Sequence, residues 1–186
     1  MDKSDITPDG WLKSTAHCPS PNFSTRPDAE ISLVVLHNIS LPPFEYGTDA
    51  VDKLFTNQLH TEKEPFFQYI QHLRVSSHLL IDRVGNITQY VSFLNMAYHA
   101  GVSSFQGQTG CNTFSIGIEL EGCDFEPFTS KQYQSLIIIL NKLTKTYPIK
   151  HITGHQHIAP ERKTDPGHFF NWSLLYDAGL PLYLDQ

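Results

Sequence analysis

The sequence predicts a single α/β domain in which helices flank a mixed central β-sheet. Three segments support this prediction: a continuous apolar run at 31–37, a strictly alternating segment at 114–121, and a long amphipathic segment at 129–147. Strand-like segments that alternate with helical ones are typical of a sheet covered by helices. With 186 residues, 40% of them hydrophobic and 17% charged, the chain is long enough to bury one core, and we expect one domain over 1–186.

The first expected strand is the run ISLVVLH at 31–37. A continuous apolar run with β-branched residues is typical of a buried strand, and this one ends at its histidine. The next ten residues, NISLPPFEYG, contain two prolines and a glycine and predict a loop, followed by a short helix over about 49–59. The segment SHLLIDRVGNITQYV at 77–91 predicts a hairpin that turns at VGN.

The segment TFSIGIELEG predicts a strand with two chemically different faces. One face carries Phe114, Ile116, Ile118 and Leu120, and the other carries Ser115, Gly117, Glu119 and Glu121. From the pattern alone, the two glutamates are expected to face solvent, since glutamate is seldom buried without a partner.

The clearest helix is expected from Thr129 to about Tyr147. Thr129 is a good N-cap, and Gln132 completes a capping box. The apolar stripe that packs on the sheet consists of Tyr133, Leu136, Ile137, Leu140 and Leu143. Pro148 marks the end of the helix.

Two further elements are expected near the carboxyl end of the chain. The residues HITGH at 151–155 predict a short strand, and 171–178 predict a last helix that Gly179 ends.

Composition excludes several classes of partner. The net charge of −6, without a basic cluster, argues against nucleic acid and against an anionic membrane as partners. The first twenty residues lack an apolar core segment, and no stretch is long enough to span a bilayer. Cys18, Cys111 and Cys123 are odd in number and form no C-x-x-C pair, which favours free thiols in or near the core and a reducing cytoplasm.

The segment GHQHIAPERKTDPGHFFNW, at 154–172, concentrates ionisable side chains between prolines and glycines. Such a mixture is typical of a metal site with acid/base groups beside it. His151 and His155 are four residues apart, as in helical zinc pairs. However, the intervening ITG disfavours a helix, and the glutamate that this motif needs after its first histidine is missing, so we exclude the helical pair.

A second set fits a metal better. His37 and His155 each end an expected strand, and Asp165 follows a constrained loop. Two imidazoles and one carboxylate are a common catalytic zinc set that leaves a fourth position open. His157 is an alternative to His155, because residues two apart on a strand share a face, and the pattern does not decide between them.

Two more residues are candidates for chemistry. Glu119 lies two residues after Gly117, whose missing side chain leaves room beside the strand. Lys163 lies two residues before Asp165, where its ammonium group can stabilise an oxyanion. Solvent exposure is the ordinary alternative for both side chains.

Several stretches of the sequence resemble those of a known family. The matching stretches are PSPNF, RPD, VVLHNISLPP, HLRVSSHLLI, AYHAGVSSFQG, CNTFSIGIELEG and GHQHIAPERKTDPG. They resemble the N-acetylmuramoyl-L-alanine amidases, most closely the AmpD-type 1,6-anhydro-N-acetylmuramyl-L-alanine amidases. The resemblance runs over about 19–172 in one order with short gaps.

The resemblance implies a Zn²⁺ ion held by His37, His155 and Asp165. It implies Glu119 as the general acid/base and Lys163 as the oxyanion stabiliser. It prefers His155 to His157, because the family's ligand is the histidine of TGH. Residues implied near the substrate cleft are Asn38, Arg74, Tyr98 and His99.

Within the superfamily, the resemblance favours the AmpD branch. Phage amidases and peptidoglycan-recognition proteins typically have cysteine where Asp165 stands and tyrosine where Glu119 stands. The chain departs from its relatives at Gly110, where an arginine is frequent, and at Tyr98, where a tryptophan is frequent. We also expect Arg162 to orient Asp165.

The implied function is zinc-dependent hydrolysis of the amide between 1,6-anhydro-N-acetylmuramic acid and L-alanine of the stem peptide. The expected setting is a cytoplasmic, monomeric enzyme of peptidoglycan-fragment recycling. The alternatives are a binding module without catalysis, a structural zinc protein, and a glycosidase that uses Glu119 and Glu121, whose separation on one strand face would be roughly 7 Å.

Overall fold

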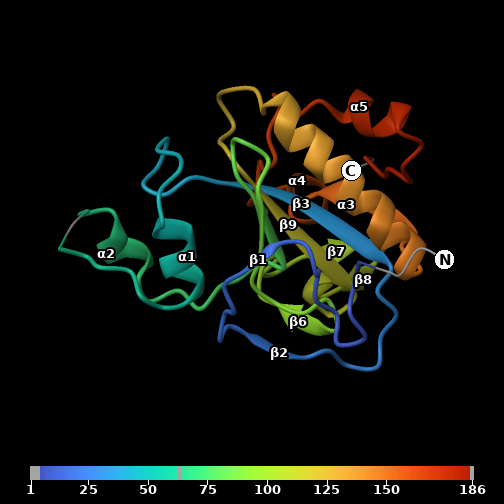
Figure 1. Ribbon diagram of the computed structural model, residues 1–186, viewed down its shortest axis with the longest axis horizontal. Helices are drawn as coiled ribbons and strands as arrows, with labels where there is room; N and C mark the ends of the chain where they lie inside the picture. Colours follow the sequence, from blue (N-terminus) through green and yellow to red (C-terminus); the bar gives the residue numbers. More distant parts are fainter. Residues whose placement is uncertain (1–4, 63, 185–186) are drawn as a thin grey trace.

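The computed structural model describes residues 5–62 and 64–184 and has a mixed six-stranded sheet at its centre (Figure 1). The strands follow the order β1-β5-β4-β9-β3-β10. Their bounds are β1 Ala16–His17, β3 Leu33–Ile39, β4 Leu79–Ile81, β5 Ile87–Gln89, β9 Ser115–Glu121 and β10 His151–Gly154. Strands β4, β9, β3 and β10 are parallel, whereas β5 is antiparallel to β4, which confirms the predicted mixed sheet and the predicted hairpin.

The remaining elements surround this sheet. Two short antiparallel pairs join β2 (Phe23–Thr25) to β6 (Asn95–Ala97) and β7 (Ser104–Phe105) to β8 (Gln108–Thr109). The helices are α1 Ala50–Phe55, α2 Phe67–Ile70, α3 Ser130–Thr146, α4 His155–Ile158, α5 Trp172–Asp177 and the 3₁₀ turn η1 Cys111–Thr113. Figure 1 shows α1 and α2 projecting to one side of the sheet, while α3 and α5 lie together on the other. No helix in the described part of the chain is long and apolar enough to cross a membrane.

Helix α3 forms where its caps predict it. The Thr129 hydroxyl accepts a hydrogen bond from the Gln132 N–H at 3.2 Å, and Gln132 Oε1 accepts one from the Thr129 N–H at 3.0 Å. The predicted capping box is therefore confirmed. One stripe residue differs: Ile139 is 1% exposed and lies in the core, whereas Ile137 is only partly buried at its margin.

The alternation of the central strands divides the core between two faces of the sheet. Ile116, Ile118 and Leu120 of β9 join the cluster that includes α3. On the other face, Leu33 and Val35 of β3 pack in a cluster with residues before β9 and in α4. Because side chains alternate along a strand, His37 shares this second face. Strand β3 continues two residues beyond His37, to Ile39, so the predicted strand end was too early.

Candidate active site

The parallel register of three strands brings the candidate residues together at their carboxyl ends. In the β3–β9 pair, His37 stands opposite Glu119. In the β10–β3 pair, Gly154 stands opposite Leu36, so the next residue, His155, arrives beside His37. The carboxyl edge of parallel strands is the usual place for a site in such sheets.

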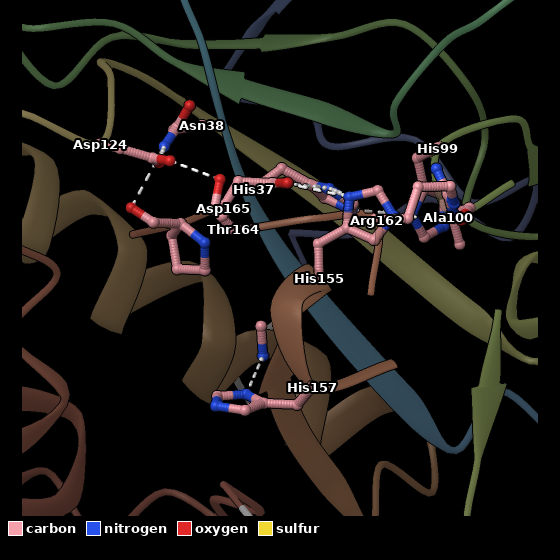
Figure 2. Close-up of polar contacts among 12 residues, drawn as sticks. His37, Asn38, His99, Ala100, Asp124, His155, His157, Arg162, Thr164 and Asp165 are labelled. Atoms are coloured by element: carbon pink, nitrogen blue, oxygen red, sulfur yellow. Dashed lines mark hydrogen bonds and ion pairs between the residues drawn. The ribbon is translucent and has the colours of Figure 1, made fainter. Parts of the chain in front are cut away.

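His37, His155 and Asp165 converge on one point (Figure 2). The two Nδ1 atoms lie 3.0 Å apart, and each lies 3.0 Å from Asp165 Oδ2. Both histidines are only 2% exposed. Among the described residues, these three form the cluster of histidine and acidic side chains suited to hold a metal ion.

The protonation states of this cluster favour a cation. Burial lowers the pKa of His37 to about 4, so its imidazole is neutral near pH 7. Burial alone would raise the pKa of Asp165, but its close contacts with His155 and His37 outweigh burial and hold this pKa below its usual range. A neutral imidazole and a carboxylate therefore meet in a poorly solvated space, where a metal cation would offset the charge.

The orientation of His155 tests whether a metal fits. Its Nε2 atom lies 3.1 Å from the carbonyl oxygen of Ala100, which can only accept, so Nε2 carries the hydrogen. The Nδ1 atom of a neutral His155 then presents a lone pair to Asp165 Oδ2. Lone pairs that face one another at 3.0 Å are explained by a shared cation, and ligand atoms of tetrahedral zinc are separated by roughly 3.3 Å. The donor set and its spacing therefore fit zinc.

His157, the alternative ligand, lies away from this cluster (Figure 2). Its Nδ1 atom accepts a hydrogen bond from the Gly154 N–H at 3.2 Å, and its ring packs against Trp172. The argument that His155 and His157 share a strand face was wrong, because both belong to helix α4. Successive helical residues point about 100° apart, so residues two apart diverge.

Glu119 is buried beside the cluster, contrary to the expectation of solvent exposure. It is 8% exposed, and no described residue hydrogen-bonds its Oε2 atom. Burial first, and the Asp165 charge second, raise the pKa of Glu119 well above its usual range, while Lys163 opposes them. A buried carboxylate with a free oxygen is suited to exchange a proton with a bound water or substrate.

Glu121 is also buried, at 5% exposed, but it has a structural role. Its Oε1 accepts from the Gly47 N–H at 2.6 Å, and its Oε2 accepts from the Arg83 N–H at 3.1 Å. Because both oxygens anchor loops, Glu121 is a poor partner for Glu119 in a carboxylate-pair glycosidase.

A cleft of about 400 Å³ opens over the cluster. It is lined by His37, Asn38, Asp124, Phe125, His155, Arg162, Lys163, Thr164 and Asp165. Lys163 is half-buried in this wall, consistent with a position near the reacting group. Asn38 donates its amide to Asp124 Oδ1 at 2.6 Å and to the Pro166 carbonyl oxygen at 3.2 Å.

The other residues implied near the substrate lie outside this cleft lining. Arg74 is exposed after α2 and donates to the carbonyl oxygens of Gln71 and Leu73. The Tyr98 N–H donates to Ser76 Oγ. Gly110 has φ 72°, a conformation that favours glycine, so a larger residue there would be strained.

Two expected roles differ from the contacts that the structure provides. Arg162, expected to orient Asp165, instead donates to the carbonyl oxygens of Ala100 and Val102, at 2.9 and 2.7 Å. His99, expected near the substrate, uses both ring nitrogens inside the protein, one of them toward His37. Asp124 and Phe125 were not predicted as cleft residues, because their place in the cleft depends on long-range loop packing.

Comparisons with known proteins agree with this geometry. The family model described as N-acetylmuramoyl-L-alanine amidase matches residues 27–168. The 1,6-anhydro-N-acetylmuramyl-L-alanine amidase AmpD of Citrobacter freundii is 53% identical over 168 residues, which cover 89% of this chain and 90% of the relative. The Escherichia coli AmpD is 52% identical over 167 residues, or 88% of this chain and 91% of the relative.

Solved structures show the same fold. A crystal structure of a selenomethionine AmpD derivative superposes with a TM-score of 0.90 at 50% identity, covering 93% of this chain and 98% of that one. The E. coli amidase AmiD, solved with the substrate anhydro-N-acetylmuramic acid-L-Ala-D-γ-Glu-L-Lys, gives a TM-score of 0.61 at 27% identity, over 94% of this chain and 65% of that one. The chain therefore belongs to the N-acetylmuramoyl-L-alanine amidase family and is about 50% identical to relatives of the AmpD type.

Proposed function

We propose that this protein is a zinc-dependent amidase that hydrolyses the amide between 1,6-anhydro-N-acetylmuramic acid and L-alanine of the stem peptide. The observation that carries the proposal is the convergence of His37, His155 and Asp165 within 3.0 Å of one another, beside a buried glutamate with a free oxygen. The AmpD relatives, named for this activity, support the choice of substrate.

The metal would be held by His37 Nδ1, His155 Nδ1 and Asp165 Oδ2. When bound, zinc supplies Lewis acidity that polarises the scissile carbonyl and lowers the pKa of water to about 7. Glu119 accepts a proton from the attacking water and delivers one to the departing alanine nitrogen. Its burial fits this exchange, because burial raises the pKa of the carboxyl and so strengthens its affinity for a proton.

Two residues of the cleft wall are assigned to the substrate. The Lys163 ammonium group stabilises the oxyanion that develops on the carbonyl oxygen. Asn38 donates its N–H groups inside the protein, which leaves its side-chain oxygen to accept from a peptide N–H of the substrate.

The proposed setting is the recycling of peptidoglycan fragments by a cytoplasmic monomer. The free thiols of Cys18, Cys111 and Cys123 support a reducing compartment. The negative net charge supports a substrate other than nucleic acid.

The test is the mass of the products formed from an anhydro-muropeptide. Release of the intact stem peptide supports the amidase, a cut sugar would indicate a glycosidase, and an unchanged substrate would indicate a binding or structural protein. The same sample should carry about one zinc per chain. Removal of the metal should abolish hydrolysis, so full activity after verified metal removal would exclude the proposed mechanism.

A further inference from the structure

The imidazoles of His37 and His155 in the candidate metal cluster both contact one dipeptide, His99–Ala100, which lies outside the cluster. The first contact joins His37 Nε2 to His99 Nδ1 at 2.9 Å. The second joins His155 Nε2 to the Ala100 carbonyl oxygen at 3.1 Å. Two consecutive residues therefore fix the far side of both rings, one through a side chain and one through the backbone (Figure 2).

These two contacts set the tautomers that a metal would require. The Ala100 carbonyl accepts, so the hydrogen of His155 is on Nε2 and Nδ1 is bare. His37 reaches the same state when its Nε2–H donates to His99 Nδ1, and the His99 Nε2–H donates onward to Ser115 Oγ at 3.1 Å. Each imidazole then presents a bare Nδ1 toward Asp165.

The strand beneath His99 has room for this arrangement only because residue 117 is glycine. A Cβ atom at Gly117 would lie 2.4 Å from Cγ of the His99 ring, closer than such atoms approach. The Ser115–Gly117–Glu119 face of β9 therefore supports the His99 ring and the catalytic glutamate together.

The two backbone N–H groups of the dipeptide are held in turn by one side chain, while Arg162 donates to the Ala100 carbonyl oxygen at 2.9 Å. Asn112 Oδ1 accepts from the Ala100 N–H at 2.8 Å and from the His99 N–H at 3.2 Å. Asn112 lies in η1 and is not among the residues that line the cleft. Its own carbonyl oxygen accepts from Arg26 at 3.1 Å, which ties it to the interior.

We infer that Asn112 is a positioning residue for the metal site: by holding the backbone of His99 and Ala100, it keeps both ligand imidazoles as Nε2–H tautomers with Nδ1 directed at the metal. This inference rests on the proposed metal site, but not on the proposed substrate. Groups that orient metal-ligating histidines typically contribute about 10–100-fold to metal affinity.

The test compares zinc affinity in three variants by competition with a chromophoric chelator. Asn112→Ala removes the shared acceptor and should weaken zinc binding by about 10–100-fold. Asn112→Asp keeps an acceptor oxygen at the same place and should restore most of the affinity. Asn141→Ala is the matched control, because the Asn141 amide donates to the Ile137 carbonyl oxygen within α3, and this variant should bind zinc like the parent protein.

Two results would overturn the inference: a folded Asn112→Ala protein with parental zinc affinity, or an Asn112→Asp protein that shows no recovery. If Asn112→Ala does not fold, nitrogen-15 NMR of the metal-free parent protein decides. Nε2–H tautomers on both His37 and His155 support the inference, and an Nδ1–H tautomer on either one overturns it. None of these measurements uses a muropeptide, so a failure of the proposed substrate would leave their outcome intact.

Discussion

The cleft has a floor formed by strand-end residues and a rim formed by loop residues, and different kinds of contact position the two. On the floor, His37, Glu119 and His155 are 2%, 8% and 2% exposed, and the register of β3, β9 and β10 fixes them. On the rim, Phe44 and Phe125 are 60% and 71% exposed, with ring centroids 5.9 Å apart. Phe44 also has φ 69°, an unusual backbone conformation for a bulky residue.

The rim depends on side-chain contacts between loops. Asp124 accepts from Asn38 at 2.6 Å and from the Thr164 hydroxyl at 2.5 Å. The Tyr46 hydroxyl donates to Glu126, which ties the loop after β3 to the loop that contains Asp124. Strand register fixes the floor, whereas loop contacts fix the rim. Substitutions in the floor should therefore change metal binding or turnover, and substitutions on the rim should change substrate affinity.

The largest effect should come from the proposed metal ligand His155. His155→Ala should lose zinc and all measurable activity, because it removes one of three converging donors. His157→Ala should keep zinc, since its ring faces Gly154 and Trp172 instead. Metal analysis of the two purified variants checks this, and the reverse order of zinc content would contradict our choice of ligand.

Glu119→Gln should keep zinc and substrate affinity but lose about 10²–10⁴-fold in turnover. Glutamine preserves the shape of the side chain and removes the proton acceptor. Turnover, zinc content and substrate binding are measured on one preparation. Near-normal turnover with normal zinc would show that another group carries the proton.

The same substitution has a pH-dependent effect on the stability of the metal-free protein. Burial raises the folded-state pKa of Glu119, so the unfolded chain releases this proton first as pH rises. The parent protein therefore loses stability from about the ordinary glutamate pKa upward, until the folded pKa is passed. Urea unfolding should find that the stability of Glu119→Gln relative to the parent rises with pH above the ordinary glutamate pKa, and a difference independent of pH would refute the burial argument.

Lys163→Met should remove roughly 2.7–4 kcal/mol of transition-state stabilisation, which corresponds to a loss of about 10²–10³-fold in turnover. Zinc should remain bound, and the acid limb of the pH profile should persist because Glu119 is still present. Lys145→Met, at an exposed position late in α3, is the matched control. Loss of the acid limb in the Lys163 variant would contradict the separation of the two roles.

On the rim, Phe125→Ala should raise KM by roughly fivefold and leave kcat unchanged. The exposed ring lines the cleft, and partial coverage by substrate is worth about 1 kcal/mol. Tyr176→Ala, 74% exposed on α5, removes a comparable aromatic elsewhere and should leave KM unchanged. A fall in kcat for Phe125→Ala would mean that rim and floor are not separate in function.

The smallest effect is expected at Arg74, which is exposed and bonded to carbonyl oxygens after α2. A guanidinium can pair with a peptide carboxylate of the substrate, so Arg74→Ala should raise KM modestly. The rise should occur only for substrates with an acidic stem residue. An unchanged KM across substrates with and without that residue would remove Arg74 from the site.

The sequence alone was sufficient for the features that depend on local backbone geometry. Alternation placed Glu119 on the face opposite Ile116 and Ile118, and β9 has the same division. Phe114, expected on the Ile116 face, precedes β9 and packs in the cluster with Leu33 and Val35 instead. The capping box at Thr129 located the start of α3, since its hydrogen bonds join residues only three apart. Periodicity and capping are decided within a few residues, so a single sequence contains them.

The tertiary structure alone decided which residues meet across the chain. His155 and His157 point in different directions because both lie in helix α4. Arg162 donates to the Ala100 carbonyl oxygen and not to Asp165, and Glu119 is buried. Asn112 and the dipeptide that it holds are separated by about a dozen residues and meet through loops, which have no periodic signal. Such contacts depend on the packing of distant segments, because hydrogen-bond partners become available only when those segments are brought together.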